Sequence, residues 1–133
     1  MEATYSYLNV QTITDSSISL IPPGRLLMSL RYNLNFGKKL QVKDVLVQYT
    51  FMNQQNKIAY NETASPAYQL LDASVQLKWN GKAPVDVQVG CRNILNSSYI
   101  DHLSRLKNIS MPSPGRNIYI SINFNISHQL KKQ

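Results

Sequence analysis

The segment "GRNIYISINFNI", residues Gly115 to Ile126, lies close to the C-terminal end of the sequence. Apolar and polar side chains alternate along it with a period of two, which is the spacing of the two faces of a β-strand. The apolar positions are Ile118, Ile120, Ile122, Phe124 and Ile126, and between them lie Asn117, Tyr119, Ser121, Asn123 and Asn125. We therefore predict a strand with one apolar face and one polar face.

Three further stretches show the same alternation: residues 25–36 ("RLLMSLRYNLNF"), 68–79 ("YQLLDASVQLKW") and 85–92 ("VDVQVGCR"). Leu27 is the one exception in the first of them. A strand over Val45 to Asn53 is less regular, and one over Ala3 to Val10 is weak. The apolar positions of the three stretches are Leu26, Met28, Leu30, Tyr32, Leu34, Phe36, Leu71, Ala73, Val75, Leu77, Trp79, Val85, Val87, Val89 and Cys91. The sequence thus predicts an all-β protein of about six strands with little helix.

The connections between these strands alternate in length. Residues 11–24, 54–67 and 95–116 form long loops, whereas residues 37–41 and 80–84 form short turns with Gly37, Asn80-Gly81 and Pro84 as turn-forming residues. This alternation predicts an antiparallel up-and-down meander with its long loops at one end, as in the wall of an outer-membrane barrel. The predicted strands, about 9 to 12 residues long, would cross a hydrocarbon core when tilted.

A two-residue period fits a soluble sandwich as well as a transmembrane barrel, and three details favour lipid contact. The apolar faces of the four regular strands carry no charged side chain. Phe36, Trp79 and Phe124 lie near strand ends on the short-turn side, where an aromatic girdle would meet the membrane interface. An isolated soluble sheet of this kind would also expose two long edges that promote aggregation.

Composition excludes several classes of function. The chain has 133 residues and a formal net charge of +7, but its basic residues are scattered, without the basic face that nucleic-acid binding requires. Cys91 is the single cysteine, so the sequence predicts neither an internal disulfide nor a cysteine metal site. No apolar run is long enough for a transmembrane helix, and the first ten residues lack the pattern of a secretion signal.

Enzyme activity is not predicted. Asp101, His102 and Ser104 fall within one short segment, and neighbours this close cannot align as nucleophile, base and orienting residue. His128 has no partner at metal-ligand spacing. The spacing of Ile100, Leu103 and Leu106 predicts a short helical turn that begins near Ser98 and Asp101, which resemble a capping box. We predict neither a catalytic residue nor a metal or cofactor.

The segment "CRNILNSSYIDHLSRLKNISMPSPGRNIYISINF" resembles the C-terminal end of TonB-dependent outer-membrane receptors. The resemblance is specific over residues 85–126 and diffuse over residues 1–84, where "IPPGRL" at 21–26 is also similar to the barrel wall of that family. The residues that carry the resemblance are Asn93, Leu95, Asn96, Tyr99, Asp101, His102, Leu103, Ser104, Arg105, Pro114, Gly115, Arg116 and Asn117.

The resemblance implies a 22-stranded outer-membrane barrel of a Gram-negative bacterium that takes up a scarce metal chelate, vitamin or glycan. Residues 1–126 would be a C-terminal segment of its wall, and residues 127–133 a polar tail. Expected partners are outer-membrane lipid, the remaining barrel and plug, the barrel-assembly machinery and, through the plug, the TonB complex. Arg31, Asp72, Asp86 and Arg92 would face the plug.

Such a C-terminal fragment would not transport a ligand alone. The alternative is a soluble β-rich module that binds a glycan or an anionic surface. The two hypotheses differ in one measurable property, because a lipid-facing wall requires detergent or membrane whereas a soluble module does not.

Overall fold

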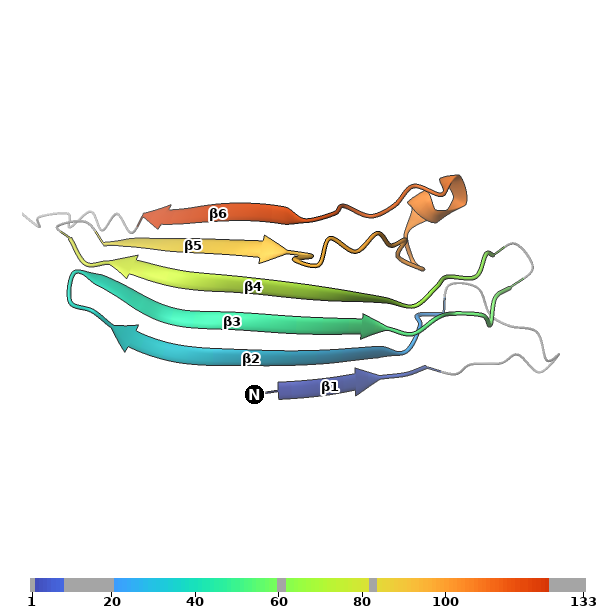
Figure 1. Cartoon of the computed structure of the whole chain (residues 1–133), viewed down its shortest axis with the longest axis horizontal. Coiled ribbons are helices and arrows are strands. Elements are labelled where there is room, and N and C mark those ends of the chain that lie inside the picture. Colours follow the sequence, from blue (N-terminus) through green and yellow to red (C-terminus); the bar gives the residue numbers. More distant parts are fainter. Residues whose placement is uncertain (1, 9–20, 60–61, 82–83, 125–133) are drawn as a thin grey trace, which may run out of the picture.

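The computed structural model describes residues 2–8, 21–59, 62–81 and 84–124. They form one antiparallel sheet in which each strand pairs with its sequence neighbours, in the order β1-β2-β3-β4-β5-β6 (Figure 1). The strands are β1 (Glu2–Ser6), β2 (Arg25–Phe36), β3 (Leu40–Met52), β4 (Tyr68–Trp79), β5 (Val85–Arg92) and β6 (Asn117–Phe124). The predicted all-β meander is confirmed. The described sheet is open, because β1 and β6 each have a single neighbour.

Several predicted boundaries are wrong. Leu40 and Gln41, predicted in a turn, belong to β3, where they pair with Trp79 and Lys78 of β4. This pairing extends β3 to 13 residues, beyond the predicted range, whereas β5 and β6 have 8 residues each. The sequence predicts a strand over residues 3–10, but β1 spans Glu2–Ser6: it begins one residue earlier and, of the predicted range, includes only residues 3–6. Residues 9 and 10 lie outside the described part of the chain. The predicted tail, residues 127–133, also lies outside it.

The predicted helical turn lies further along the chain than expected. The 3-10 helix η1 spans Arg105–Ile109, and Ser104 caps it by accepting a hydrogen bond from the Leu106 amide at 3.2 Å. Asp101 does not act in a capping box, because its Oδ1 accepts a hydrogen bond from the Leu103 amide at 2.9 Å. An aspartate that bonds to the backbone two residues later makes a local turn, which competes with helix.

Strand register sorts the side chains onto two faces. On one face, Val75 of β4 lies between Val45 and Val89, and Val87 of β5 lies between Leu77 and Ile122. We call this the apolar face, and its members are Ala3, Tyr5, Leu26, Met28, Leu30, Tyr32, Leu40, Val42, Val45, Val47, Tyr49, Phe51, Leu71, Ala73, Val75, Leu77, Trp79, Val85, Val87, Val89, Cys91, Ile118, Ile120, Ile122 and Phe124, with the uncharged polar residue Gln69 opposite Phe51. It continues across all six strands without a charged residue.

The opposite surface, the polar face, carries the charges. Arg31 of β2 lies opposite Leu46, Asp72 of β4 opposite Gln48, and Arg92 of β5 opposite Asn117. An ion pair spans two strands there, since Lys43 Nζ lies 3.1 Å from Asp86 Oδ1. Lys43 stands at a register shift between Val42 and Asp44, which lets it reach past β4 to β5.

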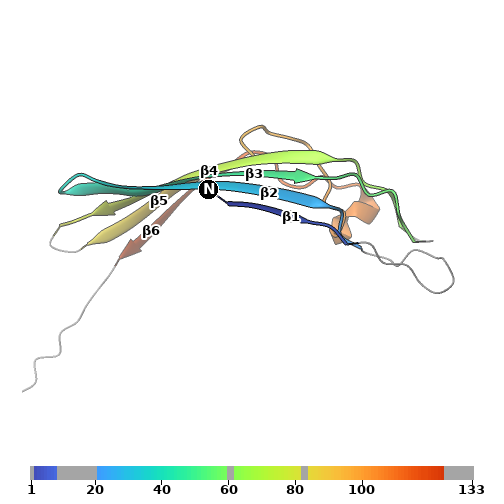
Figure 2. The same ribbon diagram turned by 90° about the horizontal axis from the view of Figure 1, so that it is seen from below.

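The sheet forms a single curved layer (Figure 2). Among the described residues, Ile21 is the only hydrophobic side chain classed as buried, with 8% of its surface exposed. On β6 the exposed fractions of Ile118 and Ile120 reach 70% and 67%. Full burial of each such side chain would contribute about 1.5–3 kcal/mol, so the strands leave a large part of the available hydrophobic stabilisation unused.

Candidate functional site

The corner between β5 and the long loop that follows it is built on two asparagines in the left-handed conformation. Asn93 and Asn96 have φ angles of 50° and 53°, a region that asparagine tolerates better than most residues. Asn93 is 4% exposed, and its side chain bonds to both backbone groups of Ser97: Nδ2 donates to the carbonyl and Oδ1 accepts from the amide, each at 2.9 Å. Its own amide donates to Asp72 Oδ1 at 2.8 Å. The corner is thereby attached to β4.

Asn96 connects the same corner to the entrance of β6. Its Oδ1 accepts a hydrogen bond from the Arg116 amide at 3.0 Å, and Arg116 Nε donates to the Ile94 carbonyl at 2.9 Å. Gly115 permits this approach, because a Cβ atom there would lie 2.8 Å from Asn96 Oδ1. Pro114 takes part through its carbonyl, which lies 3.5 Å from Asn93 Nδ2. Two segments about twenty residues apart, Asn93–Asn96 and Pro114–Arg116, are therefore in direct contact.

The other residues of the predicted motif lie along the loop. Tyr99 stacks on Tyr68 of β4 with ring centroids 4.4 Å apart, and its carbonyl accepts from the Ser113 amide at 2.8 Å. Asp101 and Ser104 make the turn and the cap described above, and Asn117 begins β6. The remaining motif side chains, Leu95, Leu103 and Arg105, are exposed. The structure thus joins Asn93, Asn96, Pro114, Gly115 and Arg116 in one cluster. Of the other motif residues, Asn117 lies in β6, His102 is buried among other polar side chains, and the rest lie along the loop.

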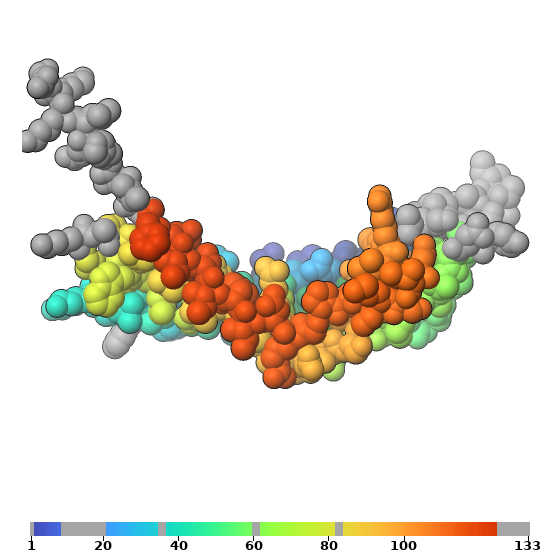
Figure 3. Space-filling view, turned by 90° about the horizontal axis from the view of Figure 1, so that it is seen from above, coloured from blue at the N-terminus to red at the C-terminus, as the bar shows by residue number. Residues whose placement is uncertain are grey.

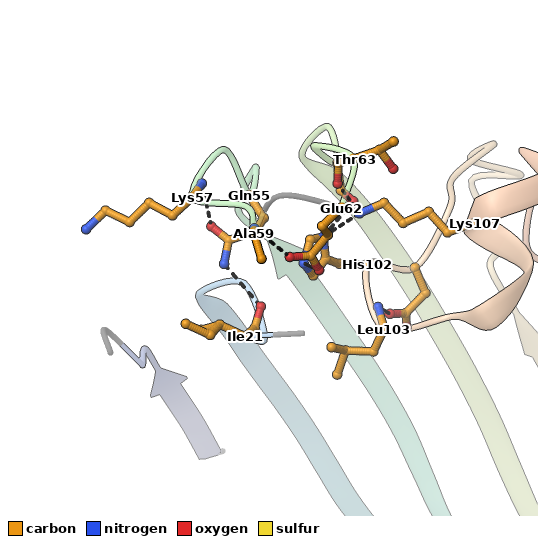
Figure 4. A network of polar contacts seen from close by, with 11 residues as sticks. Ile21, Gln55, Lys57, Ala59, Glu62, Thr63, His102, Leu103 and Lys107 are labelled. Atoms are coloured by element: carbon orange, nitrogen blue, oxygen red, sulfur yellow. Dashed lines mark hydrogen bonds and ion pairs between the residues drawn. The ribbon is translucent and has the colours of Figure 1, made fainter. Parts of the chain in front are cut away.

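His102 is the centre of a buried polar cluster between two loops (Figure 4). Its side chain is 2% exposed, and its Nε2 lies 2.9 Å from Glu62 Oε1. Its Nδ1 lies 2.8 Å from Lys107 Nζ and 2.8 Å from Ser65 Oγ. Lys107 Nζ also donates to the Thr63 carbonyl. We call Glu62, Thr63, Ser65, His102 and Lys107 the His102 cluster; it connects the 54–67 loop to the 95–116 loop.

The contacts of the cluster determine the protonation state of His102. An ammonium group only donates hydrogen bonds, so Nδ1 must accept from Lys107, and the ring proton therefore resides on Nε2, the nitrogen that lies 2.9 Å from Glu62 Oε1. Burial, followed by the charge of Lys107, lowers the pKa of His102 below its ordinary value, against the opposing effect of Glu62. Burial also lowers the pKa of Lys107. His102 is therefore neutral between a carboxylate and an ammonium group.

Ser65, His102 and Glu62 have the residue types of a hydrolytic triad without its arrangement. Lys107 already donates to the ring nitrogen that would have to accept the Ser65 proton. Ser65 is 4% exposed, and no described cavity is lined by it. The cluster connects the loops and does not present a nucleophile.

Sequence reasoning missed the partners of His102 because it considered only sequence neighbours. Ser65 lies 37 residues from His102, and Lys107, although five residues away, is buried against Thr63 of the distant loop. A sequence signal was available, because Glu62 and Ser65 stand in the long loop predicted at the same end of the sheet. The alternation predicts that Asp72 lies on the polar face, but it does not predict the hydrogen bond that Asp72 accepts from the Asn93 amide.

The polar face is hollowed along its middle strands. Two neighbouring hollows of about 340 and about 580 Å³ share Leu46 and Gln48, and the first is also lined by Asp72, Arg92 and Tyr119. The space-filling view shows the molecule hollowed between its two ends (Figure 3). We infer that the polar face is the inner side of the curved sheet. The predicted plug-facing residues Arg31, Asp72, Asp86 and Arg92 all lie on this face.

Tyr119 of β6 covers Gly90 of β5 in this hollow. A Cβ atom on Gly90 would lie 2.4 Å from Tyr119 Cζ, and the Arg92 guanidinium lies 5.4 Å from the centre of the same ring. An aromatic ring over a strand glycine covers backbone that the glycine leaves exposed, and a cation over a ring adds electrostatic attraction. Gly90, Arg92 and Tyr119 therefore form one packing unit across β5 and β6.

We expect Gly90→Val to displace Tyr119 and to destabilise the pairing of β5 with β6 by about 1–3 kcal/mol, because the added side chain would overlap the ring. Hydrogen exchange of the β6 amides in detergent measures this loss. In a chain that also carries Tyr119→Ala, Gly90→Val should cost less, since the ring is no longer there. An equal cost in both backgrounds would contradict the packing unit.

Metal ligation and helical membrane insertion find no support in the described residues. They contain no cluster of three or more histidine, cysteine, aspartate or glutamate side chains that could hold a metal ion. No helix within the described ranges is sufficiently long and apolar to cross a membrane. No known protein-family model matches the chain, and no curated protein matches it. The two faces of the sheet and its loop end are therefore the features from which a function can be inferred.

Proposed function

We propose that this chain forms a C-terminal part of the wall of a TonB-dependent outer-membrane receptor. The apolar face is the single observation that carries the proposal. It extends across six strands without a charged side chain, and on β6 it is more exposed than buried. Lipid acyl chains would cover such a face, whereas a charged residue at the bilayer midplane would cost about 2–4 kcal/mol.

The short-turn end of the sheet and the length of its longest strands are suited to a membrane-spanning wall. Val85 of β5 pairs with Trp79 on β4 and with Phe124 on β6, at the short-turn end of the apolar face. Both aromatic side chains are exposed. Aromatic rings at such a position favour the membrane interface. β2, β3 and β4, with 12 or 13 residues, exceed the length that a tilted membrane-spanning strand needs.

In the proposed receptor the polar face lines the lumen, and its hollows and charges contact the plug. The complete receptor, in the outer membrane of a Gram-negative bacterium, would take up a scarce metal chelate, vitamin or glycan with energy from the TonB complex. The chain contributes wall and loops, with no enzyme chemistry and no cofactor of its own. The open edges of β1 and β6 would pair with further strands, so these six strands alone would not transport.

Fractionation of native cells tests the proposal. An antibody against the loop from Ser98 to Pro112 should detect, in the outer-membrane fraction, a band several times larger than 15.1 kDa. The purified chain should also require detergent or phospholipid vesicles to remain dispersed. A 15.1 kDa band in the soluble fraction, together with a monomer that needs no detergent, would overturn the proposal and favour the soluble binding module.

A further inference from the structure

The His102 cluster brings the Lys107 ammonium group and the Ser65 hydroxyl group to the same imidazole nitrogen. His102 Nδ1 accepts from Lys107 Nζ at 2.8 Å, and the ring has no second free lone pair because Nε2, near Glu62 Oε1, carries the ring proton. A proton added at Nδ1 must therefore displace the Lys107 hydrogen bond. The cluster would then hold two positive charges against the Glu62 carboxylate, with His102 only 2% exposed.

We propose that the His102 cluster is an acid-sensitive latch that holds the 54–67 loop against the 95–116 loop and releases it when His102 is protonated. The latch consists of contacts between the two loops. The 54–67 loop contributes Glu62, Thr63 and Ser65, and the 95–116 loop contributes His102 and Lys107. Glu62 also orders its own loop, because its Oε2 accepts from the Ala59 amide at 3.2 Å. The latch lies outside both sheet faces, so it does not depend on the proposed membrane location.

The charged groups around His102 give the direction of the pH dependence. Burial and, after it, the charge of Lys107 lower the pKa of His102, and they outweigh Glu62 from the 54–67 loop and Asp101 from its own loop, which favour the protonated ring. A released histidine titrates near its ordinary value of 6.5. Below that value the open state binds more protons than the closed state, so the latch is fully stable above about pH 6.5 and weakens as the pH falls below it.

Hydrogen exchange of the full chain in detergent micelles tests the latch between pH 8 and pH 5. The reporters are the amides of Ala59 and Ser65, which donate to Glu62 Oε2 and to the Gln55 carbonyl, and the reference is Val47 in the centre of β3. After correction for the intrinsic exchange rate, the protection of both reporters should fall several-fold relative to Val47 as the pH passes below 6.5, because the pKa of His102 is lowered in the closed state.

Three variants separate titration from simple loss of contacts. His102→Gln keeps a donor for Glu62 and an acceptor for Lys107 but cannot titrate, so protection should stay constant over this pH range. His128→Gln removes the other histidine of the chain and should behave as the unchanged protein. Lys107→Met removes the competing cation, so a protonated His102 can donate to Ser65 and Glu62, and the loops should remain closed at pH 5.

The proposal is overturned if the unchanged chain shows flat protection, or if His102→Gln opens with acid to the same extent. It also fails if Lys107→Met opens as the unchanged chain does, because competition at Nδ1 would then not drive release. A direct NMR titration of the His102 ring covers the case in which a variant folds poorly. A ring that titrates at or above pH 6.5 while Ala59 and Ser65 stay protected would contradict the latch.

Discussion

Ile120→Arg is expected to reduce the partitioning of the chain into neutral phospholipid vesicles by about 30-fold to about 1000-fold, the equivalent of about 2–4 kcal/mol. Ile120 lies in the middle of β6, opposite Val89, and 67% of its surface is exposed on the apolar face. If lipid covers this face, the guanidinium has to enter hydrocarbon. Co-flotation of the purified chain with vesicles on a density gradient measures the change.

Ser121→Arg is the matched control, because Ser121 is the next residue of the same strand and lies opposite Gln88 on the polar face. The same charge at this position would face a wet lumen, so vesicle association should change by less than threefold. Loss of association with Ser121→Arg but not with Ile120→Arg would reverse the faces and refute the assignment. Equal, small effects of both variants would mean that the apolar face does not contact lipid.

The faces of the sheet could be predicted from sequence because they depend on a period of two, which the strands preserve along their whole length. The short connections between neighbouring strands then set the register. In that register the apolar residues of β4, β5 and β6 lie opposite one another, as the alternation predicts. Strand ends could not be predicted in this way. Leu40 is in β3 because Trp79 pairs with it, and this pairing depends on a strand almost forty residues away.

The loop end could be predicted only as a list of residues. Asn93, Asn96 and Arg116 were recognised by resemblance, but their hydrogen bonds follow from backbone conformations that no periodicity encodes. The only reactive grouping that the sequence near His102 offered was a catalytic triad with Asp101 and Ser104. In the structure, Asp101 makes a turn and Ser104 caps a helix. Its buried partners come from a loop whose position depends on the completed sheet.

Asn93, at the β5 corner, bonds both to the sheet and to the loop end. Asn93 takes part in the pairing of three segments, because its amide bonds to Asp72 of β4 while its side chain bonds to Ser97 and approaches the Pro114 carbonyl. Pro114 directly precedes the Gly115-Arg116 segment that enters β6. A change at Asn93 should therefore affect the entrance of β6 as well as the loop.

Asn93→Ala is expected to destabilise this corner by about 2–5 kcal/mol. It removes both side-chain hydrogen bonds to Ser97, each contributing about 0.5–1.5 kcal/mol, and leaves alanine at a φ of 50°, where the left-handed conformation costs about 1–2 kcal/mol. Hydrogen exchange of the amides of Ser97 and Arg116 in detergent micelles, with Val47 as reference, measures the loss.

Asn93→Gly and Asn93→Asp separate the two contributions. Glycine loses the same hydrogen bonds without the backbone cost, so it should destabilise the corner by about 1–3 kcal/mol, less than alanine does. Aspartate can still accept from the Ser97 amide, but it loses the donor to the Ser97 carbonyl and adds a carboxylate next to Asp72. Its effect should diminish as the pH is lowered and the carboxylate takes up a proton, whereas the alanine and glycine effects should not. If alanine and glycine destabilise the corner equally, its left-handed backbone contributes nothing, and the stability of the corner resides in the Ser97 hydrogen bonds alone.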